Sequence, residues 1–263
     1  MNTFKSLSAT GGLADICAQI EAARAAYKAE HPDEELVVAI SARDIAKAEK
    51  ADLFARRLSV LRPLLPWIAS PEKPDFADYV IECPAQKRAV AICQRFAERF
   101  LDRVVDDKSA ANGIVLVGTP GTGKTRLALS ALKCLADQGA PGFFISASEY
   151  FDLFTPAYCS KLDAPLTKIR TLLAGVSCLV VDDVGVAAWT DARRDRLQQL
   201  LDARSANRLP TIITTNLTKD SFSEAGAERI VSRFDQLLYP IVATWGDYRS
   251  KKALKSQTIE DVF

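Results

Sequence analysis

The sequence lacks the residues and patterns that mark several classes of protein. His31 is the only histidine, so neither a Ser-His-Asp triad nor a zinc site is expected. No apolar run approaches the roughly 18 consecutive residues of a membrane span. The first fifteen residues also lack the apolar core of a secretory signal. We therefore expect a cytoplasmic protein without a membrane partner.

Paired cysteines and an excess of charge are missing as well. The six cysteines are scattered and no two form a C-x-x-C pair, which is typical of a reducing compartment. We expect them to serve mainly as small buried apolar side chains. The 34 basic and 33 acidic residues give a net charge of +1, so any binding of nucleic acid must depend on local patches.

The N-terminal part is predicted to be helical. Apolar residues recur at steps of three and four over residues 12–30, and again from Ser41 to about Leu61. Asp44, three residues after Ser41, completes a capping-box pattern. The apolar side of these helices either contacts a protein partner or packs on the rest of the chain.

Proline marks the boundary of this helical part. Five of the twelve prolines lie between Pro63 and Pro84, and this density favours an extended linker over a helix. The sequence thus predicts three regions: a helical N-terminal module (1–62), a proline-rich linker (63–75) and a larger domain (76–263).

In the larger domain, helical patterns alternate with short apolar strands. The helical stretches are 86–104, a helix that ends near Ala136, 148–174 and 191–206. The strands are 114–117, 143–146, 178–181 and 211–214. Uninterrupted apolar strands between helices are typical of a parallel sheet that is covered on both faces. The predicted fold class is therefore α/β.

A phosphate-binding loop lies between the first of these strands and the following helix. The residues fit G-x-x-x-x-G-K-[ST] at every position: Gly118, Thr119, Pro120, Gly121, Thr122, Gly123, Lys124 and Thr125. Glycines allow backbone N–H groups to point at phosphate oxygens, the lysine reaches the β- and γ-phosphates, and the threonine hydroxyl ligates Mg²⁺. We predict binding of ATP and Mg²⁺, and we include the adjacent Arg126 among the nucleotide-binding residues.

Polar residues end two further strands. Asp182 and Asp183 follow the apolar run 178–181, and Asn216 follows Thr214 and Thr215. In a parallel sheet these ends meet beside the phosphate loop. We expect Asp182 to hold Mg²⁺, Asp183 to act as general base toward water, and Asn216 to orient that water near the γ-phosphate.

Together these motifs resemble the AAA+ ATPases, and in particular bacterial and phage replicative helicase loaders of the DnaC type. The similarity covers about residues 75–255. Beyond the phosphate loop it rests on five segments: 76–86, 181–186, 214–216, 228–234 and the W-x-x-Y-R-S element 245–250. It fades over the N-terminal module.

The resemblance implies a P-loop core with a parallel five-stranded sheet, flanking helices and a truncated or absent lid. It implies that Arg233, or alternatively Arg229, is an arginine finger that reaches the γ-phosphate of a neighbouring subunit. Arg249 would correspond to sensor 2. Asp183 stands where the catalytic residue of these ATPases is usually glutamate.

The resemblance also suggests where single-stranded DNA binds. The candidates combine aromatic and basic side chains in two places, Tyr158 with Lys161, and Trp189 with Arg193 and Arg194. Around the second place five arginines outnumber three aspartates, a local charge of +2: Arg193, Arg194, Arg196, Arg204 and Arg208 against Asp191, Asp195 and Asp202.

The expected function is ATP-dependent loading of a hexameric replicative helicase of the DnaB type onto single-stranded DNA. The N-terminal module would hold the helicase, and ATP would join neighbouring subunits of a self-associated loader. The alternative is an IstB-type helper ATPase of transposition. An adaptor that uses ATP only for its structure also stays open, because Asp183 replaces the usual glutamate. A small-molecule kinase is disfavoured, because no arginine-rich lid segment follows the third strand.

Overall fold

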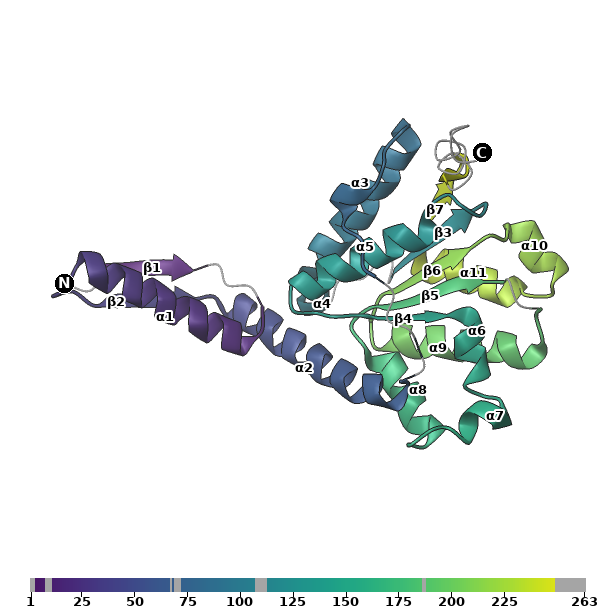
Figure 1. Cartoon of the computed structure of the whole chain (residues 1–263), viewed down its shortest axis with the longest axis horizontal. Helices are drawn as coiled ribbons and strands as arrows, with labels where there is room; N and C mark the ends of the chain where they lie inside the picture. Colours follow the sequence, from purple (N-terminus) through teal and green to yellow (C-terminus); the bar gives the residue numbers. More distant parts are fainter. Residues whose placement is uncertain are drawn as a thin grey trace, which may run out of the picture.

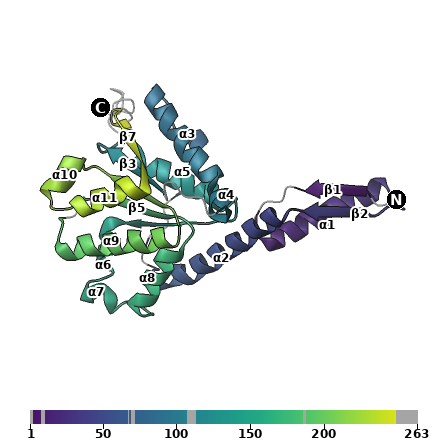
Figure 2. The same cartoon turned by 180° about the vertical axis from the view of Figure 1, so that it is seen from behind.

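The structure, a computed structural model, describes residues 3–7, 11–66, 68, 72–106, 113–185 and 188–248. A narrow N-terminal arm, residues 3–7 and 11–50, projects from a larger α/β body (Figures 1 and 2). The arm contains β1 (Thr3–Leu7), α1 (Leu13–Glu30), β2 (Leu36–Ile40) and the start of α2 (Ala42–Leu64).

The arm confirms both predicted helices and adds a small sheet. The N-cap of α2 is Ser41, whose Oγ accepts a hydrogen bond from the backbone N–H of Asp44 at 3.1 Å, as the capping pattern predicts. β1 and β2 pair in parallel, with α1 as the connection between them. These strands are not predicted from the sequence, because β1 mixes polar and apolar residues and β2 is an apolar run of only five residues, too short to distinguish a strand from a loop. The core beneath them is small, with Ile16 and Ala48 as its buried residues.

α2 continues beyond the predicted end of the module. It runs to Leu64, two residues past the expected boundary at residue 62, and ends just after Pro63, which cannot sustain a helix. Phe54 is buried in one hydrophobic core of the body, and Leu58 and Leu61 are buried in the other. The second half of α2 is therefore part of the body.

The body is built around a five-stranded parallel sheet, which confirms the predicted fold class. The strand order is β4-β5-β6-β3-β7. The strands are β3 (Gly113–Gly118), β4 (Phe143–Ser146), β5 (Leu179–Val184), β6 (Thr211–Thr215) and β7 (Leu238–Ala243). The first four match the predicted runs, and β7 is the fifth strand that the resemblance implies. β7 lies at an edge and tolerates Pro240, because an edge strand has no second ladder to donate to.

Helices cover both faces of the sheet (Figure 1). They are η1 (Phe76–Asp78, a 3₁₀ turn), α3 (Pro84–Glu98), α4 (Phe100–Val105), α5 (Lys124–Asp137), α6 (Ala147–Asp152), α7 (Pro156–Cys159), α8 (Leu166–Gly175), α9 (Asp191–Ala206), α10 (Lys219–Glu224) and α11 (Glu228–Leu237). The predicted helix 86–104 is interrupted at Arg99, and the predicted stretch 148–174 consists of three separate helices.

Alternation along the strands separates two hydrophobic cores. Val180 and Ile212 belong to the core shared with α3 and α5, whereas Val181 and Ile213 belong to the core shared with α9 and α11. Successive side chains of a strand point to opposite faces, so each strand contributes to both cores. All five strands are parallel, so their carboxyl ends lie at one edge of the sheet, where open α/β sheets bind ligands.

No helix within the described residues is long and apolar enough to cross a membrane. The same residues hold no group of three or more His, Cys, Asp or Glu side chains arranged to bind a metal ion.

Candidate functional site

The glycine-rich loop joins β3 to α5. Gly121 and Gly123 have φ angles of 79° and 84°, in the left-handed region that favours glycine. α5 begins at Lys124, so its free N–H groups and the positive end of its dipole face the loop. The loop therefore has the form expected of a phosphate cradle.

The side chain of Lys124 lies inside this loop. Its Nζ atom donates hydrogen bonds of 2.8 Å to the carbonyl oxygens of Gly118 and Thr119. Only 6% of the residue is exposed. The ammonium group is thus held within the cradle.

Side chains of α5, β5 and β6 meet beside the loop. The hydroxyl of Thr125 donates to the carboxylate of Asp182, at 3.0 Å from Oδ1. The hydroxyl of Thr214 donates to the same Oδ1 at 2.6 Å and accepts a hydrogen bond of 2.9 Å from the backbone N–H of Asp183. Thr214 is therefore a site residue that the sequence analysis quotes only as part of a motif. Its hydroxyl connects β6 to both aspartates.

The Asp182 carboxylate is buried at this junction. Burial raises its pKa above the ordinary value of 3.8, and the hydrogen bond from Thr214 only partly counteracts the effect. Carboxylate and hydroxyl oxygens are the hard ligands that Mg²⁺ prefers, and a cation would compensate the buried charge. The residues present therefore fit the predicted Mg²⁺ site of Thr125 and Asp182.

Asp183 and Asn216 lie on the open side of the junction. Asp183 is exposed and has a φ angle of 54°. It lies where the register between β5 and β6 shifts, between Val181 and Val184. Both residues line the cavity described next, and the Oδ1 atom of Asn216 is buried without a hydrogen-bond partner among the described residues. Their placement is consistent with the predicted roles toward a water molecule at the end of the phosphate chain.

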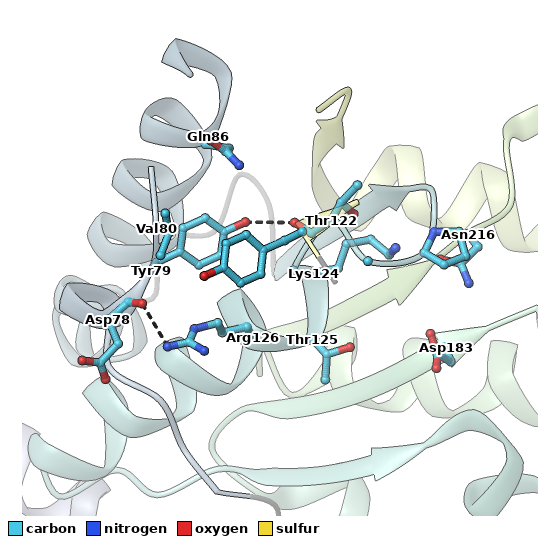
Figure 3. A pocket seen from close by; sticks show the side chains of 14 residues that line it. Asp78, Tyr79, Val80, Gln86, Thr122, Lys124, Thr125, Arg126, Asp183 and Asn216 are labelled. Atoms are coloured by element: carbon cyan, nitrogen blue, oxygen red, sulfur yellow. Dashed lines mark hydrogen bonds between the residues drawn. The ribbon is translucent and has the colours of Figure 1, made fainter. Parts of the chain in front are cut away.

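A cavity of about 490 Å³ extends from these polar side chains along the loop. Asp183 and Asn216 mark one end, and Asp78, Tyr79 and Val80 mark the other, with Lys124 between them (Figure 3). A cavity of this size suits a nucleotide-sized ligand. A nucleotide with its phosphates beside Lys124 would extend toward Tyr79.

The outer end of the cavity contains residues that the sequence analysis does not single out. Tyr79, Val80, Gln86 and Tyr248 line it, and the side chain of Arg126 donates a hydrogen bond of 2.9 Å to the backbone oxygen of Asp78. Arg126 therefore closes this end as well as lining it. In the sequence, these residues are marked only by their position within or next to the segments that resemble the helicase loaders.

The predicted arginine fingers lie outside this cavity. Arg233, on α11, forms an ion pair with Asp202 at 3.0 Å and donates to Gln236 at 3.0 Å. Arg229, on the same helix, is exposed. Neither arginine lines the cavity of its own chain. An arginine that acts on the nucleotide of a neighbouring subunit is expected to lie outside its own cavity. Arg249 lies outside the described residues.

The first pair of DNA candidates is surface exposed and adjacent. The Lys161 Nζ atom lies 5.1 Å from the centre of the Tyr158 ring, in a cation–π arrangement just after α7. Lys161 is exposed and Tyr158 partly so. An aromatic ring and a cation are therefore available together, as the prediction requires.

The second group of DNA candidates is engaged within the chain. The Trp189 ring packs against Phe151 and Phe222. Arg193 donates to the backbone oxygen of Ala188 at 2.7 Å and stacks over Phe151, whereas Arg194 donates to Ala225 O at 2.9 Å and pairs with Asp191. These side chains hold the start of α9 in place.

The expected local charge of +2 does not lie at the surface, because one of the five arginines is inside the protein. Arg204 is fully buried, and its guanidinium donates to four backbone oxygens and one hydroxyl. Helical periodicity turns this side chain inward, to backbone oxygens at the end of α8 and before β6. Without Arg204, the four remaining arginines exceed the three aspartates by only one.

Residues 93–235 match the family model described as IstB-like ATP binding protein. The replicative helicase loader DnaC of Escherichia coli K12 is 25% identical over 178 residues, 67% of this chain and 69% of that protein. The crystal structure of the DnaC helicase loader superposes with a TM-score of 0.53 at 24% identity, covering 64% of this chain and 95% of that one.

A replication initiator, DnaA bound to AMPPCP and single-stranded DNA, shares the fold with a TM-score of 0.56 at 16% identity. The match covers 70% of this chain and 55% of the DnaA chain. The resemblance found in the motifs is thus confirmed. The family model covers more than half of the 263 residues and includes the loop, both aspartates and Asn216. The chain belongs to the IstB-like ATP-binding proteins, AAA+ ATPases of the same clade as the DnaC-type loaders.

Proposed function

We propose that this protein loads a hexameric replicative helicase of the DnaB type onto single-stranded DNA in the cytoplasm, with ATP as the switch. One observation carries the proposal. A cavity lined by the phosphate loop, Asp183 and Asn216 stands on a chain whose sequence matches a DnaC loader over two thirds of its length. The arm, which differs most from the motifs of the family, is then the part that selects the partner.

The site supports hydrolysis as follows. Backbone N–H groups of the loop and the Lys124 ammonium would bind the phosphates, and Thr125 with Asp182 would hold Mg²⁺. When bound, Mg²⁺ would neutralise charge that develops on the β- and γ-phosphates. Asp183 accepts a proton from the attacking water, and the Asn216 amide orients that water.

Assembly follows from the position of α11. Arg233 lies on the body surface and its ion pair with Asp202 is half exposed, so the pair is weak and can be exchanged for a phosphate. A planar guanidinium binds phosphate oxygens with two parallel hydrogen bonds. ATP bound to one subunit would thus join it to Arg233, or to Arg229, of the next.

Single-stranded DNA would contact the surface near α7. Tyr158 and Lys161 provide one ring for stacking and one cation for a phosphate. Trp189, Arg193 and Arg194 contribute less, because their rings and donors are engaged within the chain. They would support the surface rather than form it.

The arm would bind the helicase through apolar side chains. Leu13 on α1 and Ile45 on α2 are each 41% exposed, although both are large apolar residues. Large apolar side chains that are exposed on a narrow element offer contact area to a binding partner. A second protein that covers them would remove this apolar area from water.

The proposal is tested with purified full-length protein and the hexameric replicative helicase from the same source. The double variant Leu13→Glu/Ile45→Glu should lose helicase binding while it retains ATP binding. Tyr239→Glu places the same charge at an exposed side chain on β7, far from the arm, and should bind both. If the unmodified protein binds no helicase but stimulates a transposase in the presence of ATP, the IstB-type function replaces this proposal.

A further inference from the structure

The phosphate loop is held from outside by side chains that its motif does not contain. The backbone oxygen of Thr122 accepts two hydrogen bonds, one of 2.9 Å from the Tyr79 hydroxyl and one of 2.8 Å from the indole Nε1 of Trp245. Tyr79 precedes α3, whereas Trp245 follows β7, the last strand. Two aromatic donors from opposite ends of the body thus meet on one loop oxygen.

A second hydrogen bond comes from the same C-terminal segment. The backbone N–H of Tyr248 donates to the carbonyl oxygen of Gly121 at 3.0 Å. We call residues 245–248 the C-terminal strap. It leaves the edge strand β7 and lies against the loop, where a Cβ atom added to Gly121 would overlap the side chain of Asp247. The strap and the loop are therefore in direct contact.

These contacts fix the orientation of two peptide groups. In a planar trans peptide, the carbonyl oxygen of one residue and the N–H of the next point in opposite directions. Because Thr122 O is held by Tyr79 and Trp245, the N–H of Gly123 is directed away from those side chains. Because Gly121 O is held by Tyr248, the N–H of Thr122 is directed away from the strap. Both N–H groups belong to the nest that binds phosphate oxygens.

We propose that Tyr79 and Trp245 are positioning residues that orient the loop N–H groups for phosphate, so that nucleotide affinity depends on the C-terminal strap. This positioning role is distinct from a direct contact with the base of the nucleotide. Tyr79 could also make such a contact, since it lines the outer end of the cavity (Figure 3). Burial raises the pKa of Tyr79 to about 12, so its hydroxyl keeps the proton that it donates.

The inference rests on the assignment of the loop as an ATP site but not on helicase loading. Tyr79→Phe and Trp245→Phe each remove one donor and keep an aromatic ring. The probes are ATP and inorganic triphosphate, which has no base. Each single variant should weaken both ligands by a similar factor, roughly two- to tenfold, since one hydrogen bond is lost. The double variant should weaken both further.

Tyr150→Phe is the matched control. The Tyr150 hydroxyl also donates to a backbone oxygen, that of Arg196 at 3.0 Å, but it lies in the core beneath α9. This variant should cost stability and leave the affinity for both ligands unchanged. Thermal melts of every variant separate lost stability from lost affinity. If one aromatic variant does not fold, the other tests the same oxygen from the opposite end of the body.

Three results would overturn the inference. Weaker ATP binding with unchanged triphosphate binding would make the aromatic residues base contacts. Unchanged affinity for both ligands, with a lower melting temperature, would make them structural. Unchanged affinities and unchanged melting temperatures would show that the two aromatic residues have no role in the loop. Failure of the unmodified protein to bind either ligand would instead reject the assignment of the loop.

Discussion

The backbone at Asp183 gives a physical reason for aspartate where these ATPases usually have glutamate. Its φ angle of 54° lies in the left-handed region, which aspartate and asparagine tolerate better than longer side chains because they hydrogen-bond locally. The Thr214 hydroxyl holds the Asp183 N–H at 2.9 Å and stabilises this conformation. The carboxylate is thereby directed to the open side of the junction.

Asp183→Asn should therefore keep the conformation and remove only the base. We expect ATP affinity within about twofold of the original and turnover lower by about 10²–10⁴-fold, the range for loss of a general base. A single-turnover assay at saturating ATP measures this directly. Turnover that stays within a few-fold of the original would mean that another group activates the water or that ATP serves only the structure.

The buried Asp182 carboxylate predicts a change in stability with pH. An acid whose pKa is raised by folding binds more protons in the folded state, so the free energy of unfolding falls as pH rises from 3.8 through the raised pKa. Without nucleotide or Mg²⁺, Asp182→Asn should melt at a higher temperature than the original protein at neutral pH, because its amide carries no charge to desolvate.

Thermal melts at neutral and acidic pH check this prediction. The gain from Asp182→Asn should shrink at acidic pH, where the original carboxylate is protonated. Asp183→Asn, the same substitution at an exposed neighbour, should show little change. Equal melting temperatures for Asp182→Asn and the original protein at neutral pH would contradict the account of a desolvated carboxylate.

At the scale of elements, Arg204 connects the segments that lead into the two central site strands. Its guanidinium donates to the oxygens of Leu173 and Val176 at the end of α8 and to Pro210 at the start of β6. It also donates to the Thr211 hydroxyl at 2.9 Å. These contacts fix the starting points of β5 and β6, whose opposite ends carry Asp182 and Thr214.

Arg204→Met should destabilise the protein by at least about 3 kcal/mol, because it leaves several buried acceptors unpaired. In a protein of this size the melting temperature should fall by roughly 6–12 °C. Arg204→Lys should recover only part of the loss, since an ammonium has three donors and cannot reach all the acceptors. Arg88→Met, at an exposed position on α3, is the control. A fully stable Arg204→Lys protein would show that charge, rather than the planar set of donors, is what matters.

The sequence predicts the elements of the site better than their surroundings. The loop, Asp182, Asp183 and Asn216 are local signals, because each ends an apolar strand of recognisable length. The contact of Trp245 with Thr122 joins residues 123 positions apart, and no local pattern encodes it. Likewise, the polar helix α9 looks like a solvated surface, and only the packed structure shows that Arg204 is inside while Arg193 and Arg194 are bonded to nearby backbone.

At the scale of the whole molecule, the finger hypothesis predicts that activity needs two subunits. Arg233→Ala should bind ATP but fail to hydrolyse it, because the loop, Asp182 and Asp183 are intact. Lys124→Ala should fail to bind ATP. A mixture of the two inactive proteins should regain part of the activity, since some interfaces combine an intact pocket with an intact Arg233.

An arginine finger contributes about 10³–10⁵ in rate, so a minority of complete interfaces suffices for detection. ATPase assays across a range of mixing ratios provide the measurement. If two folded, co-assembling variants recover nothing, Arg233 is not the finger and Arg229 becomes the candidate. The same mixture with Arg229→Ala tests that assignment.

The continuous helix α2 has a mechanical consequence. Its 23 residues form a rod of about 34 Å that carries the arm at one end and is clamped between the two cores at the other. Such a rod cannot swing freely, but a small tilt at the clamp becomes a large displacement at the tip. A partner bound to the arm would therefore be displaced by rearrangements of the body that are too small to alter the fold, because the rigid helix transmits and amplifies them.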